Sequence, residues 1–376
     1  MVQSDPPPAA VGRRVVSVGF AAPRLVALFE LDEEPLEEGQ FLLDTLYSGV
    51  SAGTELTQFR GSNPYLHGRW DERLKLFLPA ADGDGTSQAF PLRVTGYMEV
   101  GRVVATRSPQ VREGQMVCMA YGHKSGHRAD ARRSHFVVLP ADVDPVLGTY
   151  VAQMGPICAN GILHADAEAL GGHVSRLGEG LRGQRVAVFG AGVVGLLTAL
   201  LAQWAGAAEV AVVDRAADRL AVAARLGLRA VSTADGDPAV VLKEDWASGE
   251  RGADVAFQCS GSDVLLQHAL DALRPQGTVI DMGFYQEGAP RVRFGETFHH
   301  NGLRHVCAQI RRVPRRLATT WDRQRLSGET IAFLRDRGPQ VRAHLITRVA
   351  PFAAAQGVFD ALDGGEAGLL QAVLYP

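Results

Sequence analysis

The sequence predicts an α/β protein in which an antiparallel β domain accompanies a doubly wound parallel sheet. The chain has 376 residues, which is more than one ordinary core accommodates and indicates two domains, or one domain inserted into another. Short alternating apolar runs fill residues 11 to about 150, whereas apolar strands alternate with helical stretches from about 160 to 284. The two textures predict two different architectures along one chain.

The N-terminal part has the pattern of an antiparallel barrel. Its apolar runs are separated by Gly, Pro and acidic turns, and they read "RRVVSVGF", "RLVALFEL", "FLLDTLYSGV", "VGRVVATR", "QMVCMAY" and "SHFVVLP". Residues 61–90 form a longer excursion than a hairpin needs, with aromatic residues and a Gly/Asp tip. We expect this excursion to be either a lid or a disordered insertion.

The central part has the βαβ rhythm of a parallel sheet. Four apolar runs are strand candidates, namely "RVAVFG", "EVAVVD", "ADVAFQC" and "GTVIDMGF". Helical patterns separate them, in "VVGLLTALLAQWAG", "RLAVAARLG" and "VLLQHALDALR". This alternation predicts helices on both faces of the sheet.

The segment "RVAVFGAGVVGLLTALLAQWAGAAEVAVVDR" carries the sharpest motif. Gly190 permits a tight turn after the strand, Gly192 lets the backbone approach a pyrophosphate, and Gly195 allows the helix to pack closely on the strand. The predicted contacts at the helix N-terminus are Gly190, Gly192, Val193, Val194 and Gly195. Strand, turn, helix and a later acidic residue occur in the expected order, so the motif predicts dinucleotide binding.

Asp214, at the end of the second strand, indicates which dinucleotide is preferred. Its carboxylate can accept hydrogen bonds from the adenosine ribose, and its charge would repel a 2′-phosphate. We therefore expect NAD(H) rather than NADP(H). Arg215 leaves the phosphorylated cofactor open, because it can neutralise Asp214. Arg219 is either a second ribose contact or a solvated helix charge.

Composition excludes several other classes. The formal charge of −3 and the pI near 6.4 provide no basic field for nucleic acid. No apolar run approaches the roughly 20 residues of a membrane helix, and the N-terminal "MVQSDPPPAAVGRR" lacks the apolar core of a secretory signal. Four widely separated cysteines argue against a disulfide framework and against a cysteine-rich zinc site. A cytoplasmic protein with reduced thiols and a small-molecule substrate is expected.

These motifs, together with "LRPQGTVIDMGFY" and the C-terminal "QAVLYP", resemble the medium-chain dehydrogenase/reductase superfamily of alcohol-dehydrogenase-like proteins. The resemblance implies a GroES-like catalytic β-barrel at residues 1–158 and 318–376, with a Rossmann NAD-binding domain at 159–317. It also implies hydride transfer between a nicotinamide cofactor and a substrate. We expect a homodimer. Cys259, Ser260, Met282 and Gly283 fall where strand ends meet the cofactor, or they are packing residues.

The resemblance also indicates that the catalytic zinc of the superfamily is missing. In "SGVSAGTEL", Ser51 stands where zinc-dependent members carry the first ligand, a cysteine. Tyr97 and Met98 in "TGYMEVG" replace the Gly-His-Glu ligands, and Pro156 in "MGPICANG" takes the third position, with Cys158 two residues late. Serine, tyrosine and proline do not supply the ligands that zinc needs. An unrelated metal site at His123, His127 and His135 is the alternative to surface histidines.

Within the superfamily, the "SGVSAGTE" turn, "GYMEVG" and "ETFHHNGLRHVCAQIRRVPRR" resemble the zinc-lacking branch that includes bacteriochlorophyllide hydroxyethyl dehydrogenase. Met98 and the 61–90 loop depart from that branch. We therefore expect a secondary alcohol on a sugar, a cyclitol or another natural-product scaffold, with the tetrapyrrole as the alternative.

Without zinc, a side chain or a bound water must take the hydroxyl proton as the hydride leaves. Glu55 is predicted as the base and Tyr97 as the group that orients the substrate hydroxyl, with Ser51 and Thr54 on the same turn. The alternatives are that Glu55 caps a helix or pairs with an arginine, and that Tyr97 is a core residue. A proton relay through one of three further residues is a weaker hypothesis; these are His299, His300 and Asn301.

Two other functions stay open. Zinc-free relatives include NADPH-dependent quinone and enoyl reductases, which usually lack an acidic residue at the position of Asp214. The chain can also be a non-catalytic nucleotide-binding protein, because a fold alone does not establish function.

Overall fold

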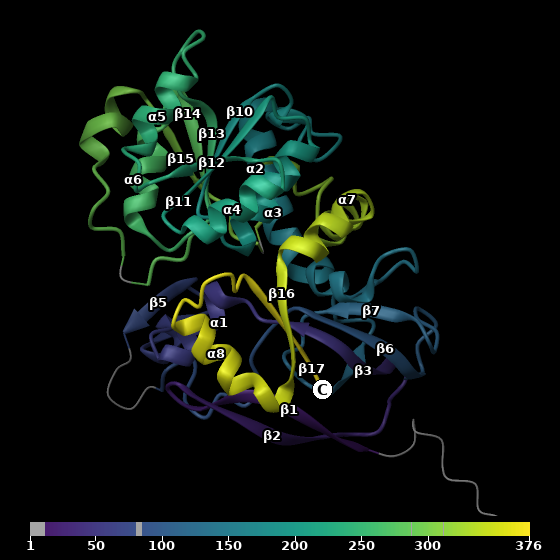
Figure 1. Cartoon of the computed structure of the whole chain (residues 1–376). Coiled ribbons are helices and arrows are strands. Elements are labelled where there is room, and N and C mark those ends of the chain that lie inside the picture. Colours follow the sequence, from purple (N-terminus) through teal and green to yellow (C-terminus); the bar gives the residue numbers. More distant parts are fainter. Residues whose placement is uncertain (1–11, 80–84, 287, 311) are drawn as a thin grey trace, which may run out of the picture. The chain divides into compact units, whose positions relative to one another are not determined.

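A computed structural model describes residues 12–79, 85–286, 288–310 and 312–376. The chain divides into two compact units (Figure 1). Unit 1 comprises residues 1–153 and 346–376, and unit 2 comprises residues 154–345. The N-terminal segment 1–11 and most of the Gly/Asp tip of the long excursion lie outside the described residues.

Unit 1 is built around a seven-stranded sheet in the order β16-β17-β3-β6-β7-β9, with β8 pairing to β3. Most pairs are antiparallel, and β16 and β17 run parallel. A separate antiparallel pair, β1 and β2, joins the sheet region through isolated bridges from β1 to Lys124 and Leu92. The strands are β1 (Arg13–Ala22), β2 (Leu25–Glu33), β3 (Gln40–Gly49), β4 (Gly68–Asp71), β5 (Leu76–Pro79), β6 (Glu99–Thr106), β7 (Met116–Met119), β8 (Gly126–Asp130), β9 (Val137–Val138), β16 (Ile346–Pro351) and β17 (Gln371–Tyr375).

Two helices accompany these strands, α1 (Ala52–Arg60) and α8 (Ala355–Asp363). Aromatic packing fixes α1: the rings of Phe20, Phe59 and Phe359 meet with centroids 5.0 to 5.6 Å apart. All three side chains are fully buried. A hydrophobic core therefore anchors α1 to β1 and α8.

In "SGVSAGTEL", the residues from Ala52 onward form a helix and not the turn that the sequence suggested. Thr54 and Glu55 lie in the first turn of α1, where an acidic side chain interacts favourably with the helix dipole. Gly61, with φ of 78°, ends the helix in the left-handed conformation. A helix presents its polar residues at fixed spacing, so the site is more rigid than a turn would be.

Part of the long excursion is ordered. Strands β4 and β5 form an antiparallel hairpin in which Trp70 and Tyr65 both contact Phe77, with ring centroids 5.0 Å apart. The described part of the excursion is thus a hairpin stabilised by aromatic contacts.

Unit 2 is a six-stranded parallel sheet in the order β12-β11-β10-β13-β14-β15. The order reverses between β10 and β13, which is where such sheets bind ligands. The strands are β10 (Arg185–Phe189), β11 (Glu209–Asp214), β12 (Arg229–Ser232), β13 (Ala253–Gln258), β14 (Leu273–Asp281) and β15 (Arg304–Cys307). The helices are α2 (Gly155–Leu170), α3 (Val193–Trp204), α4 (Ala217–Arg225), α5 (Pro238–Asp245), α6 (Asp263–Asp271) and α7 (Arg323–His344).

Local signals in the sequence explain where several of these helices begin. Asp237, Ser262 and Asp322 each accept a hydrogen bond from a backbone N–H in the first turn of α5, α6 and α7, respectively. Pro238 occupies the first position of α5, where a missing N–H costs nothing.

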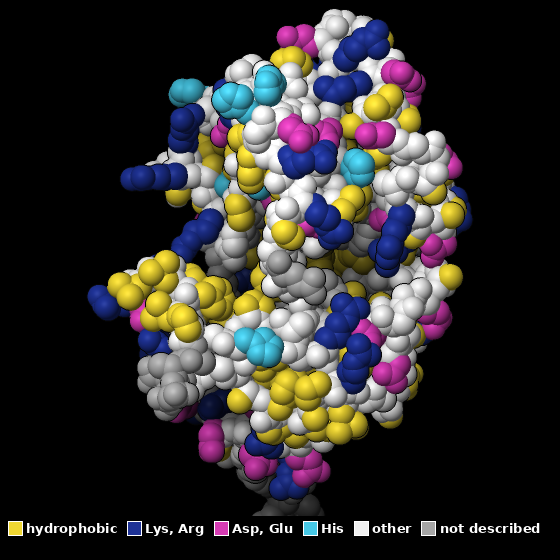
Figure 2. Space-filling view, turned by 90° about the vertical axis from the view of Figure 1, so that its left-hand side faces the viewer, with side chains coloured by type: hydrophobic (Ala, Val, Ile, Leu, Met, Phe, Trp, Pro, Cys, Tyr) yellow, Lys and Arg dark blue, Asp and Glu magenta, His cyan; other side chains and the backbone are white. Residues whose placement is uncertain are grey.

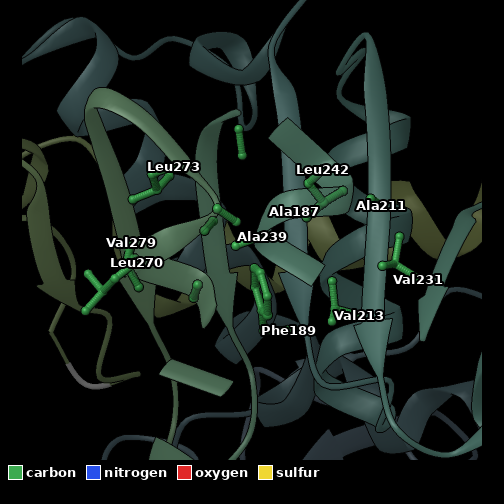
Figure 3. Close-up of a cluster of buried hydrophobic side chains, with 14 of the residues drawn as sticks. Ala187, Phe189, Ala211, Val213, Val231, Ala239, Leu242, Leu270, Leu273 and Val279 are labelled. Atoms are coloured by element: carbon green, nitrogen blue, oxygen red, sulfur yellow. The ribbon is translucent and has the colours of Figure 1, made fainter. Parts of the chain in front are cut away.

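The core of unit 2 fills the space between the sheet and helices α5 and α6 (Figure 3). Small and β-branched side chains of β10 and β11 face bulkier ones, and Phe189 is fully buried at the end of β10. At about 25 cal/mol per Å² of apolar surface, such packing is the main stabilising contribution. It also holds the carboxyl ends of β10 and β11 in fixed positions.

The fold class is confirmed as α/β with a parallel Rossmann sheet. Strands β8, β12 and β15 and hairpin β4–β5 were not predicted individually. The sequence-based ranges grouped residues 318–345 with the barrel, whereas α7 lies in unit 2 and packs on α2 and α3.

The distribution of charged side chains and the state of the cysteines agree with the composition. In the face shown by Figure 2, cationic and anionic side chains are interspersed. Among the described residues, no helix is both long and apolar enough to cross a membrane. All four cysteines are free: Cys118 and Cys158 are buried, Cys259 is partly buried and Cys307 is exposed.

Candidate functional site

The glycine turn of unit 2 has the geometry that the motif predicts. Gly190 has φ of 105°, which disfavours other residues. A Cβ on Gly195 would overlap the carbonyl oxygen of Gly190, so α3 approaches β10 too closely for any side chain. A Cβ on Gly192 would meet nothing within 4 Å. That open space beside a helix N-terminus fits a diphosphate, whose charge would interact with the first N–H groups of α3, including those of Val193 and Val194.

Asp214 connects this turn to the next strand–helix junction. Its Oδ2 accepts from the N–H of Ala191 at 2.7 Å, and its Oδ1 accepts from the N–H of Ala216 at 2.9 Å. A carboxylate has further lone pairs, so the ribose contact predicted for Asp214 is compatible with these bonds. Arg215 is exposed and Arg219 is half-buried at the start of α4.

The residues predicted at the ends of β13 and β14 have different surroundings. Cys259 and Ser260 lie directly against the glycine turn, since a Cβ on Gly190 would be 3.2 Å from Ser260 Cβ and 3.4 Å from the carbonyl carbon of Cys259. Met282 points at Gly161 of α2 and is a packing residue. A Cβ on Gly283 would overlap the carbonyl oxygen of Ser260, so this position requires close backbone approach.

The weaker relay hypothesis does not fit the fold. The backbone of Asn301 accepts from Gln276, in the first half of β14, and His300 bonds the carbonyl of Glu296. His299 and His300 are exposed. These residues precede β15 and lie near the amino-terminal edge of the sheet, whereas the glycine turn lies at the carboxyl edge.

Ser51 and Tyr97 meet in unit 1. The Ser51 hydroxyl hydrogen-bonds the Tyr97 hydroxyl, and Thr54 Oγ1 lies 3.3 Å from the same phenol oxygen. Ser51 holds the N-cap position of α1, but its side chain does not cap the helix. Tyr97 is half-buried, so the core alternative does not describe it fully. The structure therefore gathers three predicted hydroxyls around one point.

Glu55 lies behind this hydroxyl cluster and is 1% exposed. Its Oε1 accepts from the N–H of Ser51 at 2.7 Å, and its Oε2 lies 2.7 Å from Nε2 of His123. Both oxygens are thus engaged within unit 1. This is the pairing alternative for Glu55, with a histidine in place of the arginine.

The buried chain continues from His123 to a second carboxylate. Nδ1 of His123 lies 2.5 Å from the Ser48 hydroxyl, which donates to Glu99 at 3.0 Å. Burial alone would lower the pKa of His123, but Glu55 and Glu99 outweigh burial and raise the pKa. His123 therefore lies buried between two acidic side chains that favour its protonated form.

Glu99 is fully buried, and burial raises the pKa of its carboxyl group despite the opposing charge of His123. It also accepts from the N–H of Tyr121 at 2.8 Å. Gly96 lets the backbone before Tyr97 pass close to the imidazole of His123, because a Cβ at this position would be 2.7 Å from Nε2 of His123. Gly96 thereby sets the position of Tyr97.

Sequence reasoning missed the role of His123. It treated this histidine as a metal ligand or a surface residue, whereas the side chain is fully buried and paired with Glu55. These two residues are 68 positions apart. The available signal was the single glycine in each of the segments "TGY" and "YGH". In the structure both glycines have positive φ, a conformation that favours glycine.

The donor set does not fit the zinc of the zinc-dependent relatives. Ser51 and Tyr97 bond each other, Met98 is buried in the core against Gly49, and Pro156 begins α2 without a side-chain donor. Cys158 is fully buried, and burial raises the pKa of its thiol to about 12. Among the described residues, no three His, Cys, Asp or Glu side chains gather closely enough to hold a metal ion.

Comparison with known proteins agrees with the nucleotide-binding geometry. A family model described as zinc-binding dehydrogenase matches residues 193–312. This range lies within unit 2, so the match carries no information about ligands at Ser51 or Tyr97.

Similar proteins include dehydrogenases of sugars and polyols. The chain is 27% identical over 315 residues to D-guloside 3-dehydrogenase of Escherichia coli (strain K12), covering 81% of this chain and 84% of that protein. It is 33% identical over 118 residues to D-xylulose reductase of Saccharomyces cerevisiae, covering 31% and 33%. A zinc-binding-dehydrogenase-type structure from Sinorhizobium meliloti 1021, bound to NADP, shares the fold with a TM-score of 0.70 and 17% identity, covering 97% of this chain and 100% of that one.

The fold, the glycine turn and these similarities support an oxidoreductase of the alcohol-dehydrogenase-like, medium-chain dehydrogenase/reductase superfamily. The match to D-guloside 3-dehydrogenase covers 81% of this chain. The preference for NAD(H) stays a prediction.

Proposed function

We propose that this protein is a zinc-independent, NAD(H)-dependent dehydrogenase that interconverts a secondary alcohol and a ketone on a sugar or a related polyol. The observation that carries the proposal is the hydroxyl cluster of Ser51, Thr54 and Tyr97; by the family resemblance, Ser51 and Tyr97 stand where zinc-dependent members carry zinc ligands. The substrate class is supported by the length of the match to D-guloside 3-dehydrogenase.

The nicotinamide ring, when bound, accepts the hydride from the alcohol carbon or returns it to the ketone. Residues of unit 2 hold the dinucleotide: the turn Gly190–Gly195 accommodates the diphosphate, and Asp214 accepts from the ribose. A charge of −1 at Asp214 disfavours a 2′-phosphate, which supports NAD(H).

Tyr97 holds the substrate hydroxyl and takes its proton as the hydride leaves. The phenol oxygen is half-buried and hydrogen-bonds two hydroxyls, those of Ser51 and Thr54. Only the phenolate form of Tyr97 can take a proton, so oxidation should accelerate as the pH rises.

Glu55 is a positioning residue in this proposal. It holds the backbone of Ser51 and is itself held by the imidazole of His123. With 1% exposure it has no surface left for a substrate. The first hypothesis, in which Glu55 is the base, is therefore replaced by one in which Glu55 fixes the residue that hydrogen-bonds Tyr97.

The test begins with protein purified without metal-chelate chromatography. Elemental analysis should find well under one zinc per chain. The same sample should then reduce NAD⁺ with at least one member of a panel of gulosides, polyols and cyclitols, with chelator present. A full equivalent of zinc that is required for turnover would overturn the zinc-independent proposal. Turnover only with NADPH and quinones or enones would instead identify the reductase alternative.

A further inference from the structure

A buried carboxylate at the end of β14 has no role in the function described so far. Asp281 is 6% exposed, and three groups lie within hydrogen-bond distance of its carboxylate. The Tyr285 hydroxyl lies 3.0 and 3.1 Å from its two oxygens, the N–H of Gly283 donates at 2.8 Å, and Nε2 of His305 lies 2.7 Å away. Such a set fixes the position of the carboxylate.

Asp281 lies on the same edge of the sheet as the glycine turn. Gly190 ends β10 and touches Ser260, which follows β13. The carbonyl of Ser260 in turn abuts Gly283, whose Cβ direction points at the Tyr285 hydroxyl, 2.8 Å away. The contacts thus run without a break from the glycine turn across β13 to Asp281 on β14.

The strand order gives the direction in which a dinucleotide would lie. Asp214, the predicted adenosine ribose contact, ends β11, and the diphosphate turn follows β10. In the order β12-β11-β10-β13-β14-β15, the other half of the dinucleotide must extend over β13 and β14. The nicotinamide half therefore lies on the side of Asp281.

The oxidised nicotinamide ring carries a positive charge and the reduced ring does not. A carboxylate in a partly desolvated position stabilises a nearby cation more strongly than one in water does. We propose that Asp281 makes the site favour the oxidised cofactor over the reduced one, and that hydrogen bonds from Tyr285 and His305 determine how much of its charge acts on the ring. This inference rests on the proposed dinucleotide function.

The two thiols near Asp281 do not cancel its charge. Burial raises the pKa of the Cys259 thiol well above its ordinary value, and burial together with Asp281 raises the pKa of Cys307. Both thiols are neutral at neutral pH. His305, 27% exposed at its side chain, is the cation that can offset Asp281 when it is protonated.

Titration of the intact protein with NAD⁺ and NADH, followed by calorimetry or tryptophan fluorescence, tests this inference without a substrate. Asp281→Asn should weaken NAD⁺ binding about tenfold and change NADH binding about twofold or less, since only the oxidised ring is charged. Asp254→Asn is the matched control: Asp254 begins β13 at the opposite edge and is also held by hydrogen bonds, from Arg185 and Arg274. It should leave the affinity ratio unchanged.

Tyr285→Phe gives a second test with the opposite sign. It removes a donor from Asp281, so the less screened carboxylate should increase the preference for NAD⁺ by about twofold to threefold. If neither cofactor binds the unmodified protein, with NADP⁺ and NADPH also tried, the proposed function itself fails. If both bind and the ratio is the same in Asp281→Asn and Tyr285→Phe as in the unmodified protein, the role of Asp281 is refuted and the proposed function stands.

Discussion

The glycine turn of unit 2 and the hydroxyl cluster of unit 1 are built in opposite ways. The turn consists of six consecutive residues, Gly190–Gly195, and depends on glycines, which have no side chain. The cluster uses side chains from segments far apart in the sequence, including Ser51, Tyr97 and His123. Local sequence therefore encodes the first site, whereas tertiary structure assembles the second.

The difference predicts how each site fails. Replacing a residue of the turn introduces atoms where backbone already lies, so the fold suffers first. Replacing a residue of the cluster removes a hydrogen bond from an intact barrel, so chemistry or local stability suffers. The predictions below start with the largest effect.

Gly195→Ala should cause the largest loss, because its Cβ would overlap the carbonyl of Gly190. We expect thermal unfolding to show a loss of about 3 kcal/mol or more, since overpacking against backbone cannot relax through a rotamer change. Gly192→Ala is the matched control. Its Cβ meets open space, so stability should be retained while NADH affinity falls. Equal melting temperatures for Gly195→Ala and the unmodified protein would contradict the close approach of α3 to β10.

Glu55→Ala should cost about 3 kcal/mol of unfolding free energy, because it leaves the buried imidazole of His123 and the N–H of Ser51 without their hydrogen-bond partner. Urea unfolding measures this loss. Glu55→Gln keeps an acceptor and should be less destabilised. Full stability of Glu55→Gln combined with a loss of turnover of about 100-fold or more would restore Glu55 as the base.

Asp166 in unit 2 provides a contrast with Glu55, because its neighbours Glu179 and Glu329 are acidic rather than cationic. Burial raises the pKa of Asp166 to about 7, against the backbone hydrogen bonds from Gly178 and Gly180. The folded state therefore keeps a proton that the unfolded state loses near pH 4. The stability present below about pH 4 should decline as pH rises to about 7, by roughly 4 kcal/mol.

Melting temperatures across this pH range test the assignment to Asp166. Asp166→Asn cannot titrate, so its curve should be flatter than that of the unmodified protein. Parallel curves for the two proteins would show that another group is responsible.

Asp214→Asn should have the smallest effect, about a tenfold reduction in the preference for NADH over NADPH. Asparagine retains an acceptor for the N–H of Ala191 or Ala216, so the turn should stay intact. Fluorescence titration with both cofactors measures the ratio, and Arg215→Ala reports whether the arginine favours the phosphate. An unchanged ratio in Asp214→Asn would mean that this carboxylate does not face the ribose.

The sequence was informative where local rules determine structure. The glycine spacing, the apolar runs of β10, β11, β13 and β14, and the helical patterns of α3, α4 and α6 could all be identified. Short or polar strands such as β8 (Gly126–Asp130) and β12 (Arg229–Ser232) could not, because pairing with a neighbour rather than residue preference makes them strands.

The polar site shows the same limit. Ser51, Thr54 and Tyr97 could be singled out through the family resemblance, but the environment of Glu55 could not. Its burial depends on His123, Ser48 and Gly96, which meet only after the barrel has formed. A buried charge pair between residues 68 positions apart leaves no periodic signal in the sequence.

The division of labour between the two sites is tested most directly by Tyr97→Phe, with turnover and NADH affinity measured on the same preparation. Removing one hydroxyl from unit 1 should lower turnover of the best alcohol by about 100-fold or more. NADH affinity should change about twofold or less, because the residues predicted to hold the dinucleotide belong to unit 2. Unimpaired turnover, or a parallel loss of cofactor binding, would contradict a proton path through Tyr97.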